Sequence, residues 1–169
     1  MAVKNEPKNK SWLMRQLRNL FEHRALWLYV LCDEASKKGF APEAFAPDAI
    51  RRCGLFQGGA VAETAVKAEN GNPSLKTLQK KLFGLPGRLI FEMKIRRVTD
   101  DNFDVDFHYC PLVSAWQKQG CSVEEMTRLC DFAMWGDRGI AESFGCVLDL
   151  QKTIAKGDGV CEIRFKRKE

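Results

Sequence analysis

The first half of the chain places apolar residues at the spacing of amphipathic helices. Between residues 11 and 38, Leu13, Leu17, Leu20 and Leu31 recur in a rhythm close to i, i+4, i+7. This pattern predicts a long helix, which Gly39 ends. A second helix is predicted over residues 42–56, with its regular part beginning at Pro47.

Glycine-rich runs interrupt the pattern after this second helix. Gly58-Gly59 and residues 70–72 are interpreted as helix breakers on either side of a segment without a clear period. Residues 73–83 place three leucines on one side and predict a short helix. The run Gly84-Leu85-Pro86-Gly87 is predicted to end it.

The second half begins and ends with an alternation of apolar and polar residues, which is typical of half-buried strands. Residues 89–96 and 103–110 predict one hairpin with a turn at residues 99–102. Residues 146–150 and 161–165 predict a second hairpin, joined through Gly157-Asp158-Gly159.

Two helices are predicted between the hairpins. A short one covers residues 111–119, and a longer one begins at Ser122, where Ser122 and Glu125 form a capping box. An apolar stripe follows the longer helix to Phe144, and Gly136 and Gly139 predict a kink in it.

These elements predict a single α+β domain with a four-stranded antiparallel sheet, made of two hairpins, packed against roughly five helices. Residues 1–10 are polar and lysine-rich and are predicted to be a disordered leader. Residues 11–169 form the domain, with a helical part (residues 11–86) and a part that contains the sheet (residues 87–169).

Composition and charge narrow the function. The chain is 45% hydrophobic and 29% charged, which is typical of a soluble globular protein. Its densest apolar run covers only residues 25–32, which is too short to cross a bilayer. The net charge of +5 is concentrated near the two ends without a nucleic-acid-binding motif, so we expect no membrane or nucleic-acid partner. A small anionic ligand fits this charge, and a homo-oligomer is left open.

The seven cysteines are the main carriers of candidate chemistry. None forms a CxxC pair, and no export signal precedes them, so we expect free thiols in the cytoplasm. The chain contains no Gly-rich phosphate loop, GxSxG elbow or HExxH motif, which argues against P-loop enzymes, α/β-hydrolases and zincins.

A carboxylate interrupts the apolar stripe of the long helix. Asp137 shares this stripe with Cys130, about 10 Å away along an unbroken helix. Asp137 either pairs locally with Arg138 or forms a polar edge of the stripe, or it acts as a general acid/base in a pocket beside Cys130. Asp131, rotated about 100° away, is the alternative carboxylate.

Cys110 follows His108 at the end of the predicted strand. Two residues on one strand face lie about 6–7 Å apart, so His108 is either an exposed side chain or a group that lowers the pKa of Cys110. Asp158 is assigned mainly to the turn, and Cys161 mainly to the core. Together, Cys110, Cys130 and Cys161 offer a three-thiolate site for a divalent metal such as zinc, although their spacing matches no compact zinc module.

Three segments together carry a resemblance to a known family. A strand ending in Cys110-Pro111-Leu112, a helix containing Leu129-Cys130 and the run from Thr153 to Cys161 resemble the L-2-amino-thiazoline-4-carboxylic acid hydrolase family. The closing hairpin is also similar to that of vinyl-reductase-type ligand-binding domains. Leu150 and Thr153 stand where the zinc-binding sensors of that type carry further ligands.

The resemblance implies hydrolysis of a cyclic C–N bond in a small carboxylated heterocycle. It implies Cys110 as nucleophile or metal ligand, with Cys130 and Cys161 as its companions. Asp137 or Asp131 is the expected acid/base, and His108 is expected to tune the thiol. The expected substrate-binding residues are Arg128 or Arg138. The alternative is a non-catalytic domain that binds or senses a small molecule.

Overall fold

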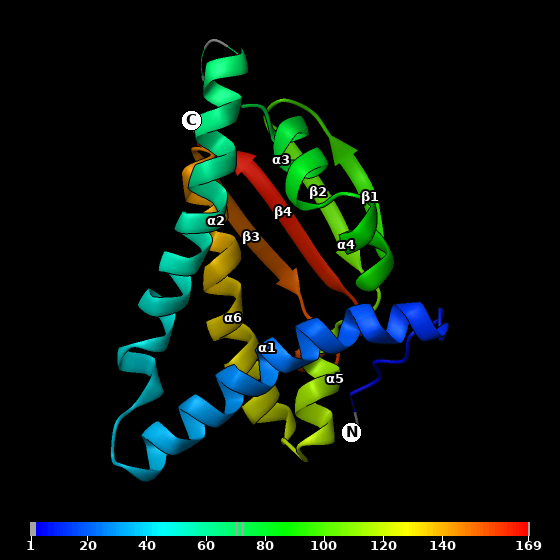
Figure 1. The fold of residues 1–169 in the computed structure, drawn as a ribbon, viewed down its shortest axis with the longest axis vertical. Coiled ribbons are helices and arrows are strands. Elements are labelled where there is room, and N and C mark those ends of the chain that lie inside the picture. Colours follow the sequence, from blue (N-terminus) through cyan, green and yellow to red (C-terminus); the bar gives the residue numbers. More distant parts are fainter. Residues whose placement is uncertain (1–2, 70, 72, 169) are drawn as a thin grey trace.

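The computed structural model describes residues 3–69, 71 and 73–168 (Figure 1). These residues form a four-stranded antiparallel sheet in the order β1-β2-β4-β3 and six α-helices, which confirms the predicted α+β class. In chain order the elements are α1 (Trp12–Lys37), the 3-10 helix η1 (Pro42–Ala44), α2 (Ala46–Glu69), α3 (Leu75–Leu82), α4 (Leu85–Ile90), β1 (Met93–Val98), β2 (Asn102–Phe107), α5 (Pro111–Lys118), α6 (Val123–Ser143), β3 (Cys146–Lys152), the 3-10 helix η2 (Ile154–Lys156) and β4 (Cys161–Arg167).

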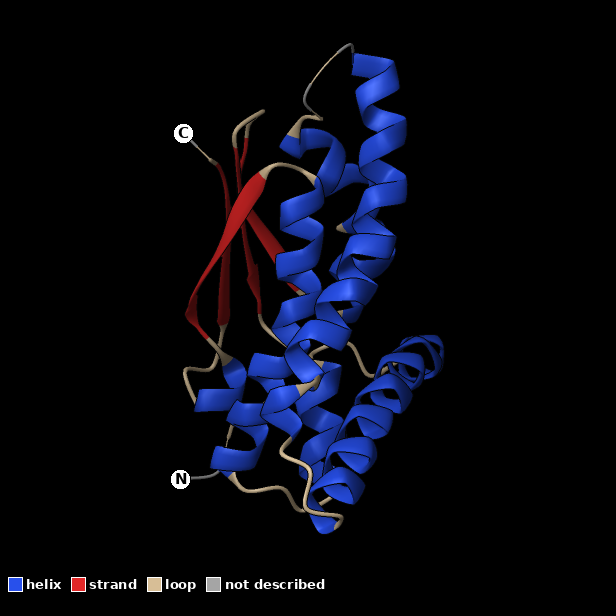
Figure 2. Ribbon diagram, turned by 90° about the vertical axis from the view of Figure 1, so that its left-hand side faces the viewer, coloured by secondary structure: helices blue, strands red, loops and turns tan. Residues whose placement is uncertain are grey.

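The two predicted hairpins join through their later strands. β1 pairs with β2, β3 pairs with β4, and the central ladder aligns β2 with β4. Apolar side chains on one face of this ladder, including Phe103 and Phe165, are fully buried, and their rings stack with centroids 5.6 Å apart. Figure 2 shows this sheet nearly edge-on, with the long helices gathered to one side of it.

α2 and α6 pack against each other through glycine. A Cβ atom on Gly54 would lie 1.9 Å from the carbonyl oxygen of Gly136, and one on Gly139 would lie 2.4 Å from that of Arg51. A Cβ on Gly58 would lie 2.9 Å from the Cα atom of Ile140. The two helix backbones therefore approach more closely than any side chain would permit.

This contact explains why one prediction about glycine was wrong. Helix α2 does not end at residue 56 but runs through Gly58-Gly59 to Glu69. Helix α6 likewise continues through Gly136 and Gly139 as one element, and the kink at these residues stays a prediction. The glycines weaken the helices locally, but the close packing of the two helices compensates for that loss.

Two boundaries around the first hairpin also differ from the prediction. Gly84-Leu85-Pro86-Gly87 does not simply end a helix, because the short helix α4 begins at Leu85 with Pro86 in its first turn. The first strand consequently begins at Met93, and Leu89 is helical. Strand β2 ends at Phe107, so His108 and Cys110 do not belong to one strand face, and Cys110 is the N-cap residue of α5.

The N-terminal segment, predicted to be a disordered leader, makes specific contacts over its described residues 3–10. The side chain of Asn5 donates to the carbonyl of Cys110 at 2.8 Å and accepts from its amide at 2.9 Å. Val3 is buried, and its carbonyl accepts a hydrogen bond from Gln117. Residues 1 and 2 of this leader lie outside the described residues.

Within the described ranges, the helices are all too short or too polar to span a bilayer.

Replacement of Gly54 tests the contact between α2 and α6. In Gly54→Ala the new methyl group would overlap the backbone of Gly136, so we expect the free energy of unfolding to fall by about 2–4 kcal/mol. Gly59→Ala is the matched control, because a Cβ there meets nothing within 4 Å and alanine favours helix by up to about 1 kcal/mol. Urea unfolding of both variants gives the comparison. Equal stabilities would contradict the proposed role of the close contact.

Candidate functional site

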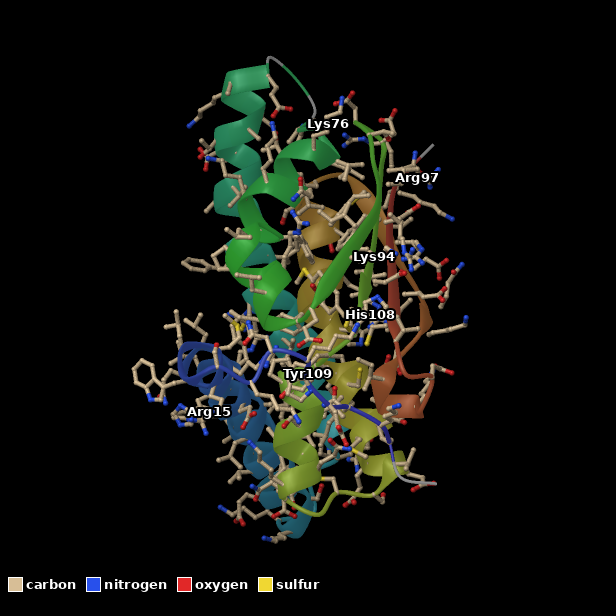
Figure 3. All side chains as sticks on the ribbon, turned by 90° about the vertical axis from the view of Figure 1, so that its right-hand side faces the viewer. Arg15, Lys76, Lys94, Arg97, His108 and Tyr109 are labelled. Atoms are coloured by element: carbon tan, nitrogen blue, oxygen red, sulfur yellow. The ribbon has the colours of Figure 1, made fainter. Side chains whose placement is uncertain are left out.

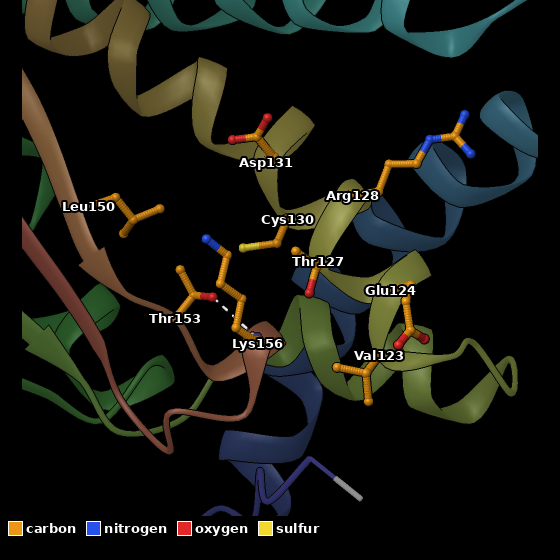
Figure 4. Close-up of a pocket in the computed structure, with 9 residues that line it drawn as sticks. All are labelled: Val123, Glu124, Thr127, Arg128, Cys130, Asp131, Leu150, Thr153 and Lys156. Atoms are coloured by element: carbon orange, nitrogen blue, oxygen red, sulfur yellow. Dashed lines mark hydrogen bonds between the residues drawn. The ribbon is translucent and has the colours of Figure 1, made fainter. Parts of the chain in front are cut away.

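A pocket of about 550 Å³ lies between α6, the end of β3 and η2 (Figure 4). It contains a thiol, two hydroxyl groups and side chains of both charges. The residues that line it are Val123, Glu124, Thr127, Arg128, Cys130, Asp131, Leu150, Thr153 and Lys156. Three of the predicted site residues therefore meet in one pocket, namely Cys130, Asp131 and Arg128.

Cys130 is the thiol of this pocket. Figure 4 shows the side chain of Lys156 reaching across the pocket, with its amine beside the sulfur of Cys130. Burial raises the pKa of Cys130 to about 12, and negative charge on Cys110, Asp131 and Asp137 adds to the increase, whereas Lys156 lowers it. The resting group is therefore a neutral thiol, and Lys156 is the nearby cation that would stabilise its anion.

Lys156 is held by the tight loop between β3 and β4. The hydroxyl of Thr153 caps η2 by accepting from the amide of Lys156 at 3.2 Å. Gly157 and Gly159 adopt positive φ angles of 96° and 72°, as the predicted turn requires. Asp158 accepts from the amide of Thr153 at 2.8 Å, which supports the role in the turn that its position predicts.

Cys110 lies behind the pocket rather than in its wall. It is buried, and burial raises the pKa of its thiol, while the backbone N–H groups of Val113 and Leu112 at the start of α5 act in the opposite direction. Negative charge on Cys110 raises the pKa of both Cys130 and Cys161. The strand end, the helix and the last hairpin thus bring the three sulfur atoms into one region.

These thiols do not have the geometry of a metal centre. In the described part of the chain, no three His, Cys, Asp or Glu side chains are grouped so that they could hold a metal ion. The sulfur of Cys161 already accepts the amide of Ile154 at 3.3 Å. The arrangement of Cys110, Cys130 and Cys161 therefore does not fit the predicted zinc site.

Asp137 lies near the same group of sulfur atoms. Burial raises the pKa of its carboxyl group to about 6, and the positive charge of Arg24 on α1 partly opposes this increase. Negative charge on Asp137 in turn raises the pKa of Cys110 and Cys130. Asp137 does not line the pocket. Its raised pKa is the property expected of a group that exchanges protons near neutral pH.

The predicted carboxylate-binding arginines are both engaged elsewhere. The guanidinium of Arg128 forms a salt bridge with Glu43, in which its Nε lies 2.6 Å from the carboxylate, and Figure 4 shows it pointing away from Cys130. Arg138 is not part of the pocket wall and lies 3.5 Å from Asp131. Lys156 has no acidic partner among the described residues, so it is the cation that remains available for a ligand carboxylate.

His108 was predicted to tune Cys110. It lies beyond the end of β2, and its amide donates to the carbonyl of Glu92 at 3.4 Å. In Figure 3, His108 lies next to the sheet, whereas Tyr109 lies toward α1. His108 is not among the groups that shift the pKa of Cys110. Its role in tuning the thiol stays a prediction that this arrangement does not favour.

Sequence reasoning missed Lys156 as a functional residue. Lys156 is the one basic side chain within the run from Thr153 to Cys161, which carries the resemblance to the hydrolase family. A single basic side chain in this short turn was the available signal. Leu150 and Thr153 also line the pocket, so the positions that would carry further ligands in zinc-binding sensors are apolar and hydroxylated here.

A comparison against protein families identifies a match over most of the chain. The profile of the family described as L-2-amino-thiazoline-4-carboxylic acid hydrolase matches residues 18–165. The chain belongs to this hydrolase family. The match covers the pocket, all three clustered cysteines and Asp137, and it extends well beyond the segments that carried the resemblance.

Comparison with individual proteins adds information on the fold of this hydrolase family member. The trafficking protein particle complex subunit 3 from Naegleria fowleri, solved covalently bound to palmitic acid, superposes with a TM-score of 0.54. The sequences are 13% identical, and the match covers 88% of this chain and 95% of that chain. At this identity the likeness shows a shared fold. No match to a curated protein was found.

The raised pKa of Asp137 predicts how stability depends on pH. As pH rises from about 4 to about 6, the unfolded chain loses this proton first, so ionisation favours unfolding and the free energy of unfolding falls. Asp137→Asn has no carboxyl group to ionise, so its free energy of unfolding does not show this decrease. We expect the variant to be more stable than the wild type by roughly 1–3 kcal/mol at pH 7 and nearly equal to it at about pH 4.

Urea unfolding at several pH values would measure this difference. A difference between variant and wild type that stays constant from about pH 4 to about pH 7 would show that Asp137 ionises as it does in water.

Proposed function

We propose that this chain hydrolyses the ring C–N bond of a small carboxylated heterocycle such as 2-aminothiazoline-4-carboxylate, in the pocket that contains Cys130. The observation that supports this most directly is the pairing of Cys130 with Lys156 at the pocket wall. A thiol is a nucleophile suited to an amidine-like carbon, and a cation beside it stabilises the anion that forms. Membership of the hydrolase family supplies the substrate class.

In the proposed reaction, the sulfur of Cys130 attacks the carbon between the ring nitrogen and the ring sulfur. A C–S bond forms while the thiol proton moves to the ring nitrogen. The ring C–N bond then breaks, and the nitrogen keeps the bonding electrons and leaves as an amine after taking a second proton from water. The hydroxide left by that water adds to the same carbon, the bond between this carbon and the sulfur of Cys130 breaks, and the sulfur takes the hydroxyl proton to become a thiol again. A ring-opened carbamoyl compound is the product.

The other members of the cluster would assist this chemistry. Lys156 would bind the substrate carboxylate or stabilise the thiolate, because it is the pocket cation without an acidic partner in the described chain. Asp137 would act through Cys130 and Cys110, since its charge state changes the pKa of both thiols. Asp131 lies in the pocket wall and would exchange protons with the substrate.

A second candidate function is a binding domain that retains such a ligand without converting it. The raised pKa of Cys130 favours this alternative, since a neutral thiol is a weak nucleophile. The same pocket would then serve as a sensor for a small carboxylated molecule. The two functions make different predictions about product formation, and substitution of one thiol tests them.

Cys130→Ser tests the enzymatic function. We expect turnover of 2-aminothiazoline-4-carboxylate, followed by liquid chromatography and mass spectrometry, to fall by about 100-fold or more, because a serine hydroxyl is far less nucleophilic than a thiol. Cys53→Ser is the matched control, because Cys53 is an exposed thiol on α2 that does not line the pocket, and it should leave turnover unchanged.

Three other outcomes would revise the proposal. Loss of turnover in Cys110→Ser but not in Cys130→Ser, with both variants folded, would transfer the nucleophile to Cys110. Thermal stabilisation of the wild type by the compound without any product would favour the sensor. Wild type that neither binds nor converts the compound would reject this substrate class.

A weaker effect is expected at Lys156. In Lys156→Gln, loss of the cation should raise KM for the carboxylated substrate by about 10-fold or more, while kcat falls less. Lys152→Gln, which removes a lysine from the nearby end of β3, is the control. Steady-state kinetics of both variants measure the effects on KM and kcat separately. An unchanged KM in Lys156→Gln would show that the substrate carboxylate is held elsewhere.

A further inference from the structure

A second pocket lies on a different part of the molecule and shares no lining residue with the first. It has a volume of about 650 Å³ and is bounded by the N-terminal segment, the first turns of α1, Tyr109 and one side of α5. The side chains that determine its character are Lys10, Trp12, Arg15, Arg18, Tyr109 and Lys118. The proposed hydrolase reaction uses none of them.

The pocket has an excess of positive charge. Four of its lining residues are cationic, and Glu22 is its one acidic lining residue. Arg18 is paired with Glu92 and Lys118 with Glu22. Within the described chain, Lys10 and Arg15 have no acidic partner at salt-bridge distance, so two cations are left uncompensated.

The start of α1 adds to this positive potential. The first turn of α1 contains no acidic residue, although a helix N-terminus carries partial positive charge that carboxylates usually offset. Lys10 and Arg15 instead flank this end with further positive charge. This end of α1 therefore has a positive potential that attracts an anion.

An aromatic surface accompanies the free cations. The indole of Trp12 is 66% exposed although it forms part of the pocket wall. Tyr109 is buried beneath the guanidinium of Arg18, which lies 4.4 Å from the centre of its ring. An exposed indole beside unpaired cations is the combination that binds a flat ring attached to an anionic group.

The wall of the pocket is held in place before any ligand binds. Buried Arg18 donates to the carbonyls of Asn9 and Ile90 at 2.5 and 3.0 Å and to the carboxylate of Glu92 at 3.0 Å. The same carboxylate oxygen of Glu92 accepts the amides of Lys8 and Asn9. These bonds fix Arg18 and the backbone just before Lys10, so the floor of the pocket needs little ordering on binding.

We propose that this second pocket binds a nucleoside phosphate, with the phosphate on Lys10 and Arg15 and the base stacked on Trp12. Charge alone would select any phosphate, and the indole alone would select any flat ring. The two together select a molecule that carries both. Arg18 and Tyr109 form the fixed floor beneath it.

Isothermal titration calorimetry with AMP, adenosine and inorganic phosphate tests the ligand class. We expect AMP to bind at least 10-fold more tightly than adenosine or phosphate, with an affinity that falls as salt rises. Phosphate binding as tightly as AMP would overturn the role of the base. Failure of AMP to bind at millimolar concentration would overturn the whole proposal.

Substitutions test the location. We expect Lys10→Gln/Arg15→Gln and Trp12→Ala each to weaken AMP binding by about 10-fold or more. Lys76→Gln/Lys94→Gln removes the same charge from exposed side chains that Figure 3 shows far from Arg15, and it should bind AMP within about twofold of the wild type. Equal weakening in that control would overturn the assignment to this pocket. Circular dichroism confirms that each variant is folded.

Discussion

The contact between the backbones of α2 and α6 is the constraint on which the rest of the structure depends. Helix α6 carries Cys130, Asp131 and Asp137, and its position is set mainly by α2. Glycine at residues 54 and 136 lets the two backbones meet without an intervening side chain. Arg51 and Glu142 then pair across the same interface at 2.6 Å. A displacement of α6 would therefore move every acidic or thiol group that the candidate site takes from this helix.

The three clustered cysteines have different physical roles despite their proximity. Cys161 stabilises the loop that holds Lys156, because its sulfur accepts the amide of Ile154. Cys110 is buried at the start of α5, where its backbone is also held by Asn5. Cys130 is the one whose side chain lines the pocket. The three sulfur atoms are close together because α6, the N-cap of α5 and the start of β4 meet in this region. Only the sulfur of Cys130 lines the pocket.

Most of the fold could be predicted from local patterns, because strands and amphipathic helices have periods that sequence reveals directly. The capping box at Ser122 and Glu125 and the turn at Gly157 and Gly159 appear in the structure as predicted. Gly58 was misinterpreted because a glycine that breaks a helix and one that admits a neighbouring helix have the same local sequence. Only the tertiary contact distinguishes them.

The candidate site could be predicted only in part, because local sequence patterns show some of its residues and tertiary contacts determine the others. Cys130 could be named because it belongs to the apolar stripe of the long helix, and Asp131 because it is the carboxylate next to Cys130 on that helix. Lys156 could not be assigned, because an exposed lysine in a turn is ordinary until the opposite helix places a sulfur atom beside it. Arg128 was a reasonable candidate by charge, but its partner Glu43 lies 85 residues away in the sequence. Long-range pairs of this kind leave no local signal.

The double hydrogen bond between Asn5 and the backbone of Cys110 has a consequence for the order of folding. Its two partners are 105 residues apart, and the Cys110 groups take up their positions only when β2 has ended and α5 has begun. Closing so long a loop is entropically costly before those elements exist. Docking of the segment around Asn5 therefore follows the formation of β2 and α5, and the wall that this segment gives to the second pocket is completed only after both elements exist.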